Sequence, residues 1–312
     1  MLILNELPIK DLFEQAAAEL AIDSAMVEKD WYVTQVLAFM ANLNLQGYKI
    51  VFSGGTSLSK AHGLIKRFSE DIDFKVLTNE KSPDRKTLSK FKNAVVGALI
   101  KAEFLVDSGS LKARDGNKFF SIDIHYNTHF TPVSGLRPHI QLEISVTQLQ
   151  LPHCKRSVQS MLSELQKGLA EVGSIACVDP VETAADKLSA LVWRIPKQAF
   201  EEQTNDRSLV RHIHDLAALE KSVQKEASFS RLVINSLKGD NERFIEITGR
   251  SIEAKFALLL DMLSRGDKKY REEYDTFVKS VSYAPEGVVP DFDTAVGALK
   301  RLISLVLTSK TS

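Results

Sequence analysis

The chain has few cysteines, no long apolar run and no net charge. Its 312 residues include two cysteines, Cys154 and Cys177, whose spacing fits neither a disulfide scaffold nor a set of metal ligands. We therefore expect a reducing, cytoplasmic location. No uninterrupted apolar stretch approaches the roughly 18 residues that a membrane-spanning helix needs. Glu6 follows the apolar first residues too soon for a signal peptide, so we expect no membrane association.

The absence of net charge limits how this chain could contact nucleic acid. The 40 basic and 40 acidic side chains give a formal net charge of +0, so such a contact must depend on a local patch. Residues 81–118 contain nine Lys or Arg and four Asp or Glu. This excess is typical either of a solvated helix and turn or of a nucleic-acid-binding surface.

The most informative motif begins with two glycines. Residues 48–52 are β-rich and apolar, which predicts a strand. Gly54 and Gly55 follow this strand, and without Cβ atoms they let a phosphate approach the backbone. Thr56 and Ser57 are suited to cap the next helix, whose free N–H groups favour an anion. The segment therefore predicts a phosphate-binding turn.

An Asp-x-Asp motif follows the glycine turn. Asp71 and Asp73 begin a second predicted strand, and residues two apart on a strand share a face. Two neighbouring carboxylates repel each other unless a cation lies between them. Mg²⁺, shared with the phosphates of a nucleotide, suits such a position. Each motif alone is common, but the order strand, Gly-Gly, helix and Asp-x-Asp is far more specific.

The remaining periodicity predicts an α+β protein, with a mixed sheet core flanked by helices and a helical C-terminal domain. Strands are expected at residues 119–126, 140–146 and, more briefly, 175–178. Helices are expected at residues 8–22, 24–40, 83–106 (ending in a β-like stretch at 104–106), 155–171, 180–191, 207–222, 228–237, 250–266, 268–282 and 292–308. We expect a boundary near residue 150, between a domain of residues 1–150 and a mainly helical domain of residues 151–312.

A third carboxylate is expected beside the Asp-x-Asp motif. Glu143 lies at the centre of the polar face of the strand at 140–146. Asp123 lies in a similar pattern in the strand at 119–126 and is the rival candidate. Each residue alone is more often simply a solvated strand residue.

Polar residues of the helical half are weaker candidates. The stem of Lys187 could run along apolar neighbours on its helix, so that its charge neutralises a phosphate; alone, it would more often be a surface lysine. Asp215 lies four residues after Arg211 and could pair with it on a helix. His212 and His214 diverge on that helix, so we expect no metal site there.

Taken together, these motifs resemble the AbiEii/AbiGii-type nucleotidyltransferase toxins, a branch of the DNA polymerase β-like nucleotidyltransferase superfamily. The matching segments are VEKDWYVT (27–34), FSGGTSLSK (52–60) and RFSEDIDF (67–74), then 142–144, 182–191 and 211–216. Relatives often have Arg-Asp-x-x-Asp where this chain has Arg211-His212-Ile213-His214-Asp215. The resemblance implies catalytic roles for Asp71, Asp73, Glu143, Lys187 and Asp215, with Asp71 and Asp73 as metal ligands. It implies nucleotide-binding roles for Gly54, Gly55, Thr56, Ser57, Lys60, Arg67 and Ser69.

The resemblance also implies an activity and its partners. The expected enzyme moves a nucleoside monophosphate from an NTP to an acceptor, expected to be an RNA such as tRNA, with Mg²⁺ as cofactor. The expected setting is phage defence (abortive infection), with an antitoxin that has a DNA-binding domain. Two alternatives stay open. One is phosphoryl transfer, or nucleotidyl transfer to a protein or small molecule, and the other is a non-catalytic nucleotide-binding module.

Overall fold

The computed structural model describes residues 10–80, 82–131, 136–201, 206, 208–283 and 289–309. The chain forms two compact units. The first, called here the sheet unit, comprises Met1–Gly63 and Phe68–Val178. The second, the helical unit, comprises Leu64–Arg67 and Asp179–Ser312. The chain thus divides after Val178 rather than near residue 150, because two strands beyond residue 150 join the sheet of the first unit.

The sheet unit is built on a seven-stranded sheet with the order β3-β4-β5-β2-β1-β7-β6. The β2–β5 and β1–β7 pairs are parallel and the other neighbours are antiparallel, so the sheet is mixed, as predicted. The strands are β1 (Tyr48–Ser53), β2 (Asp71–Thr78), β3 (Leu105–Arg114), β4 (Phe119–His125), β5 (Ile140–Val146), β6 (Cys154–Val158) and β7 (Val172–Cys177).

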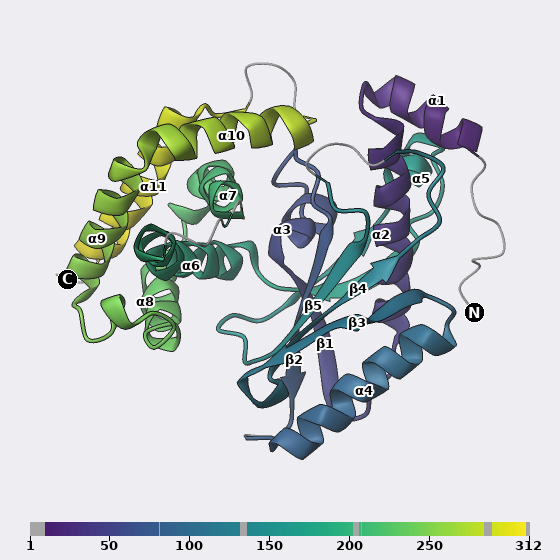
Figure 1. Cartoon of the computed structure of the whole chain (residues 1–312), viewed down its shortest axis with the longest axis horizontal. Helices are drawn as coiled ribbons and strands as arrows, with labels where there is room; N and C mark the ends of the chain where they lie inside the picture. The colour runs from purple at the N-terminus through teal and green to yellow at the C-terminus, as the bar shows by residue number, and fades with distance from the viewer. Residues whose placement is uncertain are drawn as a thin grey trace. The chain divides into compact units, whose positions relative to one another are not determined.

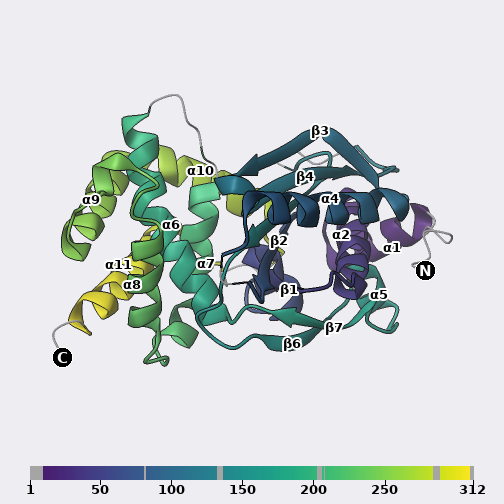
Figure 2. The ribbon, with the colours of Figure 1, turned by 90° about the horizontal axis from the view of Figure 1, so that it is seen from below.

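One face of the central strands is apolar and packs on helices. Alternation along β2 points Ile72 and Phe74 to this face, where they join one buried cluster with Val33 of α2 and Phe91 of α4. Figures 1 and 2 show α2 and α4 running alongside the strands. The opposite face therefore receives the polar residues of the same strands. The helices are α1 (Lys10–Leu20), α2 (Ser24–Asn42), α3 (Gly54–Thr56), the π-helical η1 (Ser57–Ala61), α4 (Arg85–Lys101), the 3₁₀ turn η2 (Asp115–Asn117) and α5 (Met161–Leu165).

The helical unit has its own core. Asp179 caps its first helix by accepting a hydrogen bond from the N–H of Val181, and Pro180 occupies the first helical position, where its missing N–H costs nothing. Leu188, Leu216 and Leu302 from three different helices are fully buried. The helices are α6 (Pro180–Phe200), α7 (Ser208–Val223), α8 (Phe229–Gly239), the 3₁₀ turn η3 (Ile245–Ile247), α9 (Ile252–Arg265), α10 (Asp267–Val281) and α11 (Phe292–Thr308). Among the described residues, no helix is long and apolar enough to cross a membrane.

Two strands at the sheet's edges differ from the predictions. The predicted helix at 155–171 is wrong, because Cys154–Val158 forms edge strand β6 and only Met161–Leu165 is helical. Strand β3 continues to Arg114, well past the predicted β-like end at 106. Both edge strands are mostly exposed, so they lack the apolar alternation that identifies the central strands. The predicted helix at 180–191 is confirmed but too short, because α6 continues to Phe200. The other predicted elements are confirmed within a few residues; residues 8, 9 and 207 of the predicted helices lie outside the described part.

Candidate active site

The glycine turn and the Asp-x-Asp strand are in direct contact. Gly54 has a φ of +73°, a conformation that glycine adopts without strain. A Cβ atom added to Gly54 would lie 1.9 Å from Oδ2 of Asp73 and 2.6 Å from its Cγ. Only glycine therefore allows the carboxylate of Asp73 to lie against the backbone of the turn.

The strand register brings a second acidic residue next to Asp73. Asp73 pairs with Ser53 of β1 on one side and with Glu143 of β5 on the other. Adjacent strands are roughly 4.8 Å apart, and all three side chains point to the same face. Asp71 lies two residues earlier on this face and is half-buried, like Asp73 and Glu143. The predicted strand phase of Asp71 and Asp73 is confirmed.

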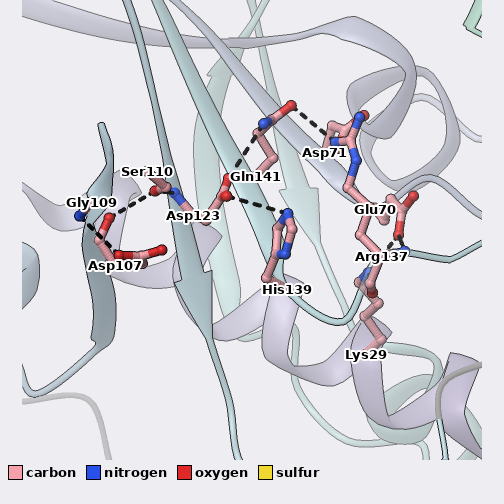
Figure 3. A network of polar contacts seen from close by, with 10 residues as sticks. All are labelled: Lys29, Glu70, Asp71, Asp107, Gly109, Ser110, Asp123, Arg137, His139 and Gln141. Carbon is pink, nitrogen blue, oxygen red and sulfur yellow. Dashed lines mark hydrogen bonds and ion pairs between the residues drawn. The ribbon is translucent and has the colours of Figure 1, made fainter. Parts of the chain in front are cut away.

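Asp123, the rival to Glu143, lies farther from the Asp-x-Asp motif. Its register partner on β5 is Gln141, which separates it from Asp71. Its carboxylate accepts a hydrogen bond of 3.3 Å from Nε2 of Gln141 and lies 3.5 Å from Nε2 of His139 (Figure 3). Burial lowers the pKa of His139, although Asp123 opposes this change. The geometry thus favours Glu143 as the third carboxylate.

The two hydroxyls after the glycines differ from the predicted capping roles. Ser53 is the residue before the helical turn, whereas Thr56 and Ser57 lie inside it. The hydroxyl of Thr56 donates to the backbone oxygen of Asp71 and lies 2.9 Å from Oγ of Ser69. The hydroxyl of Ser57 is buried and has no hydrogen-bond partner among the described residues. Thr56 therefore links the glycine turn to the start of β2.

The segment at 27–34 contributes buried charges rather than an open surface. Glu28, Lys29 and Asp30 are all at most 3% exposed, so each needs a partner. Nζ of Lys60 lies 2.5 Å from Oδ1 of Asp30, whose other oxygen accepts the N–H of Met161. Lys60, predicted to bind nucleotide, is thus engaged in a nearly buried ion pair.

Arg137 contacts the Asp-x-Asp motif, and sequence reasoning missed it. Its Nη1 lies 2.5 Å from Oδ1 of Asp71 and 2.9 Å from Oε1 of Gln141 (Figure 3). A single arginine in a loop belongs to no periodic pattern, so no sequence signal identified it.

The helical unit brings together three of the predicted site residues. Nε and Nη2 of Arg67 each lie 2.7 Å from a different oxygen of Asp215, and Nζ of Lys187 lies 2.9 Å from Oδ2. All three side chains are buried. Asp215 thus pairs with Arg67 and Lys187. The guanidinium of Arg67, which was predicted to bind nucleotide, is held by this carboxylate.

Ionisation within this cluster follows from its charges. Burial alone would raise the pKa of Asp215, but the charges of Arg67 and Lys187 outweigh it and hold the pKa well below its usual value. Burial, with help from Lys187 and Arg194, holds the pKa of His212 well below its usual value. His212 is therefore neutral at neutral pH. Its Nε2 accepts from Nη1 of Arg194 at 2.9 Å, because a guanidinium can only donate. His214 packs on Tyr274 and Phe277, and its Nδ1 lies 3.4 Å from Oδ1 of Asp215.

The donor set at β2 fits a hard divalent cation. Asp71 and Asp73 offer carboxylate oxygens on one face, with Glu143 beside them, and Mg²⁺ takes one or two protein carboxylates together with substrate phosphates and water. The space that a Cβ on residue 54 would fill is occupied by the carboxylate of Asp73. Within the described ranges, no group of three His, Cys, Asp or Glu side chains forms a metal site by itself. With two protein carboxylates, such an ion would take its other ligands from water and substrate oxygens.

Comparison with known families identifies the chain. Residues 37–298 match the sequence profile of the nucleotidyl transferase AbiEii toxin family, a type IV toxin–antitoxin system. The chain is a member of the AbiEii family. It is therefore a nucleotidyltransferase toxin with a nucleoside triphosphate as substrate and an antitoxin as partner. The AbiEii match spans both compact units.

Other comparisons add little detail. No curated protein matches the chain. Among solved structures, MenT4, a nucleotidyltransferase toxin from Mycobacterium tuberculosis H37Rv, matches with a TM-score of 0.39 and 17% sequence identity. That match covers 95% of this chain and 99% of MenT4.

Proposed function

We propose that this AbiEii protein transfers a nucleoside monophosphate from an NTP to a hydroxyl of an RNA acceptor, such as a tRNA, in a Mg²⁺-dependent reaction. The observation that supports this most strongly is the contact between Gly54 and Asp73, whose register partner on β5 is Glu143. The contact joins the glycine turn, whose backbone N–H groups suit a phosphate, to carboxylates of the kind that hold Mg²⁺.

Each candidate site residue of the sheet unit discussed next has a role in this proposal. Asp71 and Asp73 would hold Mg²⁺, which supplies positive charge next to the triphosphate. Backbone N–H groups around Gly55 bind phosphate oxygens. Thr56 and Ser69 stabilise the turn against β2 through their hydroxyls. Ser57 and Lys60 support the turn from its buried side, since Ser57 is buried and Lys60 pairs with Asp30.

The proposed chemistry is a single displacement at the α-phosphorus. The acceptor oxygen bonds to this phosphorus while its bond to the bridging oxygen of the leaving pyrophosphate breaks. Glu143 takes the proton of the acceptor hydroxyl. From the family motifs, we further propose that Lys187 neutralises phosphate charge and that Asp215 and Arg67 hold Lys187 in place, in keeping with their buried ion pairs.

The biological setting is proposed from family membership. We propose that the toxin acts in the cytoplasm during phage defence and that its antitoxin contains a DNA-binding domain. The basic segment at 81–118, most of which forms α4 and β3, is a candidate surface for the RNA acceptor. Replacing Lys86, Lys90 and Lys92 with glutamine should raise the apparent KM for RNA and leave that for the NTP unchanged.

Labelled nucleotides test the reaction. With α-labelled NTP, the label should move to RNA, and with γ-labelled NTP it should not. Transfer of the γ label would instead show phosphoryl transfer, and transfer of the α label to a protein or small molecule alone would change the acceptor. Stabilisation by Mg²⁺-NTP with no transfer to any acceptor would indicate a non-catalytic module.

A further inference from the structure

The backbone of Arg137 is fixed by a buried ion pair next to the Asp-x-Asp motif. Nζ of Lys29 lies 2.5 Å from Oε2 of Glu70, and these side chains are 1% and 2% exposed. The same Lys29 donates to the backbone oxygen of Arg137 at 2.6 Å, and the backbone N–H of Arg137 donates to Glu70 at 2.8 Å. Glu70, which directly precedes Asp71, and its partner Lys29 thus hold both polar backbone groups of Arg137 (Figure 3).

The side chain of Arg137, in contrast, is 42% exposed. Its Nη1 is shared between Asp71 and Gln141, at 2.5 and 2.9 Å. Because its backbone is fixed and its guanidinium is exposed, the side chain of Arg137 can change partners while the loop stays in place.

The contact with Asp71 is incompatible with a divalent cation on the same oxygen. A cation on either oxygen of Asp71 would lie within a few ångströms of the guanidinium that contacts Oδ1, and like charges at that distance repel strongly. The arriving cation would therefore displace Arg137. The displaced guanidinium, still held near the site by its backbone, would meet the phosphates that the cation binds. Its planar pair of donors suits a phosphate better than the ammonium of lysine does.

We propose that Arg137 is a phosphate-binding residue that exchanges Asp71 for a substrate phosphate when the divalent cation binds. This inference rests on the proposed role of Asp71 and Asp73 as cation ligands. The phosphate belongs to the NTP or to the acceptor. Lys29 and Glu70 act as positioning residues for Arg137.

The test measures binding without any turnover. Mn²⁺ serves as a paramagnetic probe of the cation, and affinities are measured for wild type, Arg137→Gln and Asp71→Asn. The matched control is Arg156→Gln, which removes the same charge from exposed strand β6 of the same unit. We expect Arg137→Gln to bind Mn²⁺ about tenfold more tightly than wild type and Arg156→Gln, because a competing cation is removed. Thermal unfolding should show that both variants are folded.

Two phosphate probes then identify the second partner. With Mn²⁺ saturating, inorganic tripolyphosphate represents the NTP, and an RNA oligonucleotide without a triphosphate represents the acceptor. Arg137→Gln should weaken one of the two at least tenfold, and the weakened probe identifies which phosphate Arg137 binds. Arg137→Lys, which keeps the charge but loses the paired donors, should give an intermediate loss.

The outcomes separate this inference from the proposed function. If wild type shows no Mn²⁺ binding that Asp71→Asn removes, the cation role of Asp71 fails and the inference fails with it. If wild type binds Mn²⁺ through Asp71 but Arg137→Gln matches Arg156→Gln in Mn²⁺ affinity, only the inference is wrong. Unchanged affinity for both phosphate probes would also overturn it.

Discussion

A Cβ atom on residue 54 would lie 1.9 Å from Oδ2 of Asp73, so the turn and the carboxylate can share this space only if residue 54 is glycine. The φ of +73° at Gly54 adds a second requirement for glycine. Two segments that are separate in sequence are thereby fixed against each other at the candidate active site.

Replacing Gly54 with alanine should remove activity with limited loss of stability. The positive φ costs about 1–2 kcal/mol for a non-glycine residue, and the added Cβ pushes Asp73 out of position. We expect at least a 100-fold fall in kcat/KM in the label-transfer assay, with a folded protein by circular dichroism.

Gly47→Ala is the matched control for this substitution. Gly47 has a φ of +81°, but a Cβ there would have nothing within 4 Å. It should therefore show a similar loss of stability and keep most of its activity. Equal activity of the two alanine variants would refute the proposed importance of the Gly54–Asp73 contact.

Glu143 and Asp123 should differ sharply as catalytic residues. Glu143 lies beside Asp73 in the strand register, whereas Asp123 is separated from Asp71 by Gln141. Glu143→Gln should lower kcat by about 10²–10⁴-fold, the usual contribution of a positioned general base. Asp123→Asn should lower kcat less than tenfold. A larger loss in Asp123→Asn than in Glu143→Gln would reverse the assignment.

The adjacent hydroxyls of Thr56 and Ser57 should contribute unequally to stability. Thr56 donates to the backbone oxygen of Asp71, so Thr56→Val should lower the free energy of unfolding by about 1–2 kcal/mol. Ser57 has no hydrogen-bond partner among the described residues, so Ser57→Ala should change it by less than about 0.5 kcal/mol. Chemical denaturation measures both values. If Ser57→Ala instead weakens NTP binding, Ser57 binds the nucleotide as the sequence predicted.

The Asp215 ion pairs should stabilise the fold in a pH-dependent way. The folded-state pKa of Asp215 is well below its usual value of about 4. Its contribution is therefore complete above pH 4 and is lost as the pH falls below that value toward the folded-state pKa. At pH 7, Asp215→Asn should cost about 3–5 kcal/mol, because two buried cations lose their partner.

The check is the free energy of unfolding of wild type and Asp215→Asn from pH 7 down to pH 2.5. The difference between them should shrink below pH 4. Asp293→Asn is a suitable control, because Asp293 pairs with Arg271 at an exposed surface and should matter little. A difference that stays constant down to pH 2.5 would show that folding does not lower the pKa of Asp215.

The sequence was most informative where local periodicity and packing agree. The phase of Asp71 and Asp73 follows from strand alternation, and the helices of the second unit follow from apolar spacing. Edge strand β6 was wrongly predicted as helix, because an edge strand needs few apolar residues and Lys155 and Arg156 face solvent. Local pattern was thus a poor guide at the margins of the sheet.

Tertiary pairing could not be predicted from spacing alone. Arg211 and Asp215 have the spacing of a helical ion pair, yet Asp215 pairs with Arg67, 148 residues away in the sequence. Arg137 likewise reaches Asp71 across 66 residues. Such contacts depend on how distant segments pack together, and periodicity contains no information on that.

The central claim is that Asp71 and Asp73 support nucleotidyl transfer to RNA, and its most direct test is transfer of an α-labelled NTP in the presence of Mg²⁺. Wild-type protein should label RNA, and Asp71→Asn and Asp73→Asn should each reduce the labelling at least 100-fold while remaining folded. RNA labelling at the wild-type rate by either variant would contradict the account.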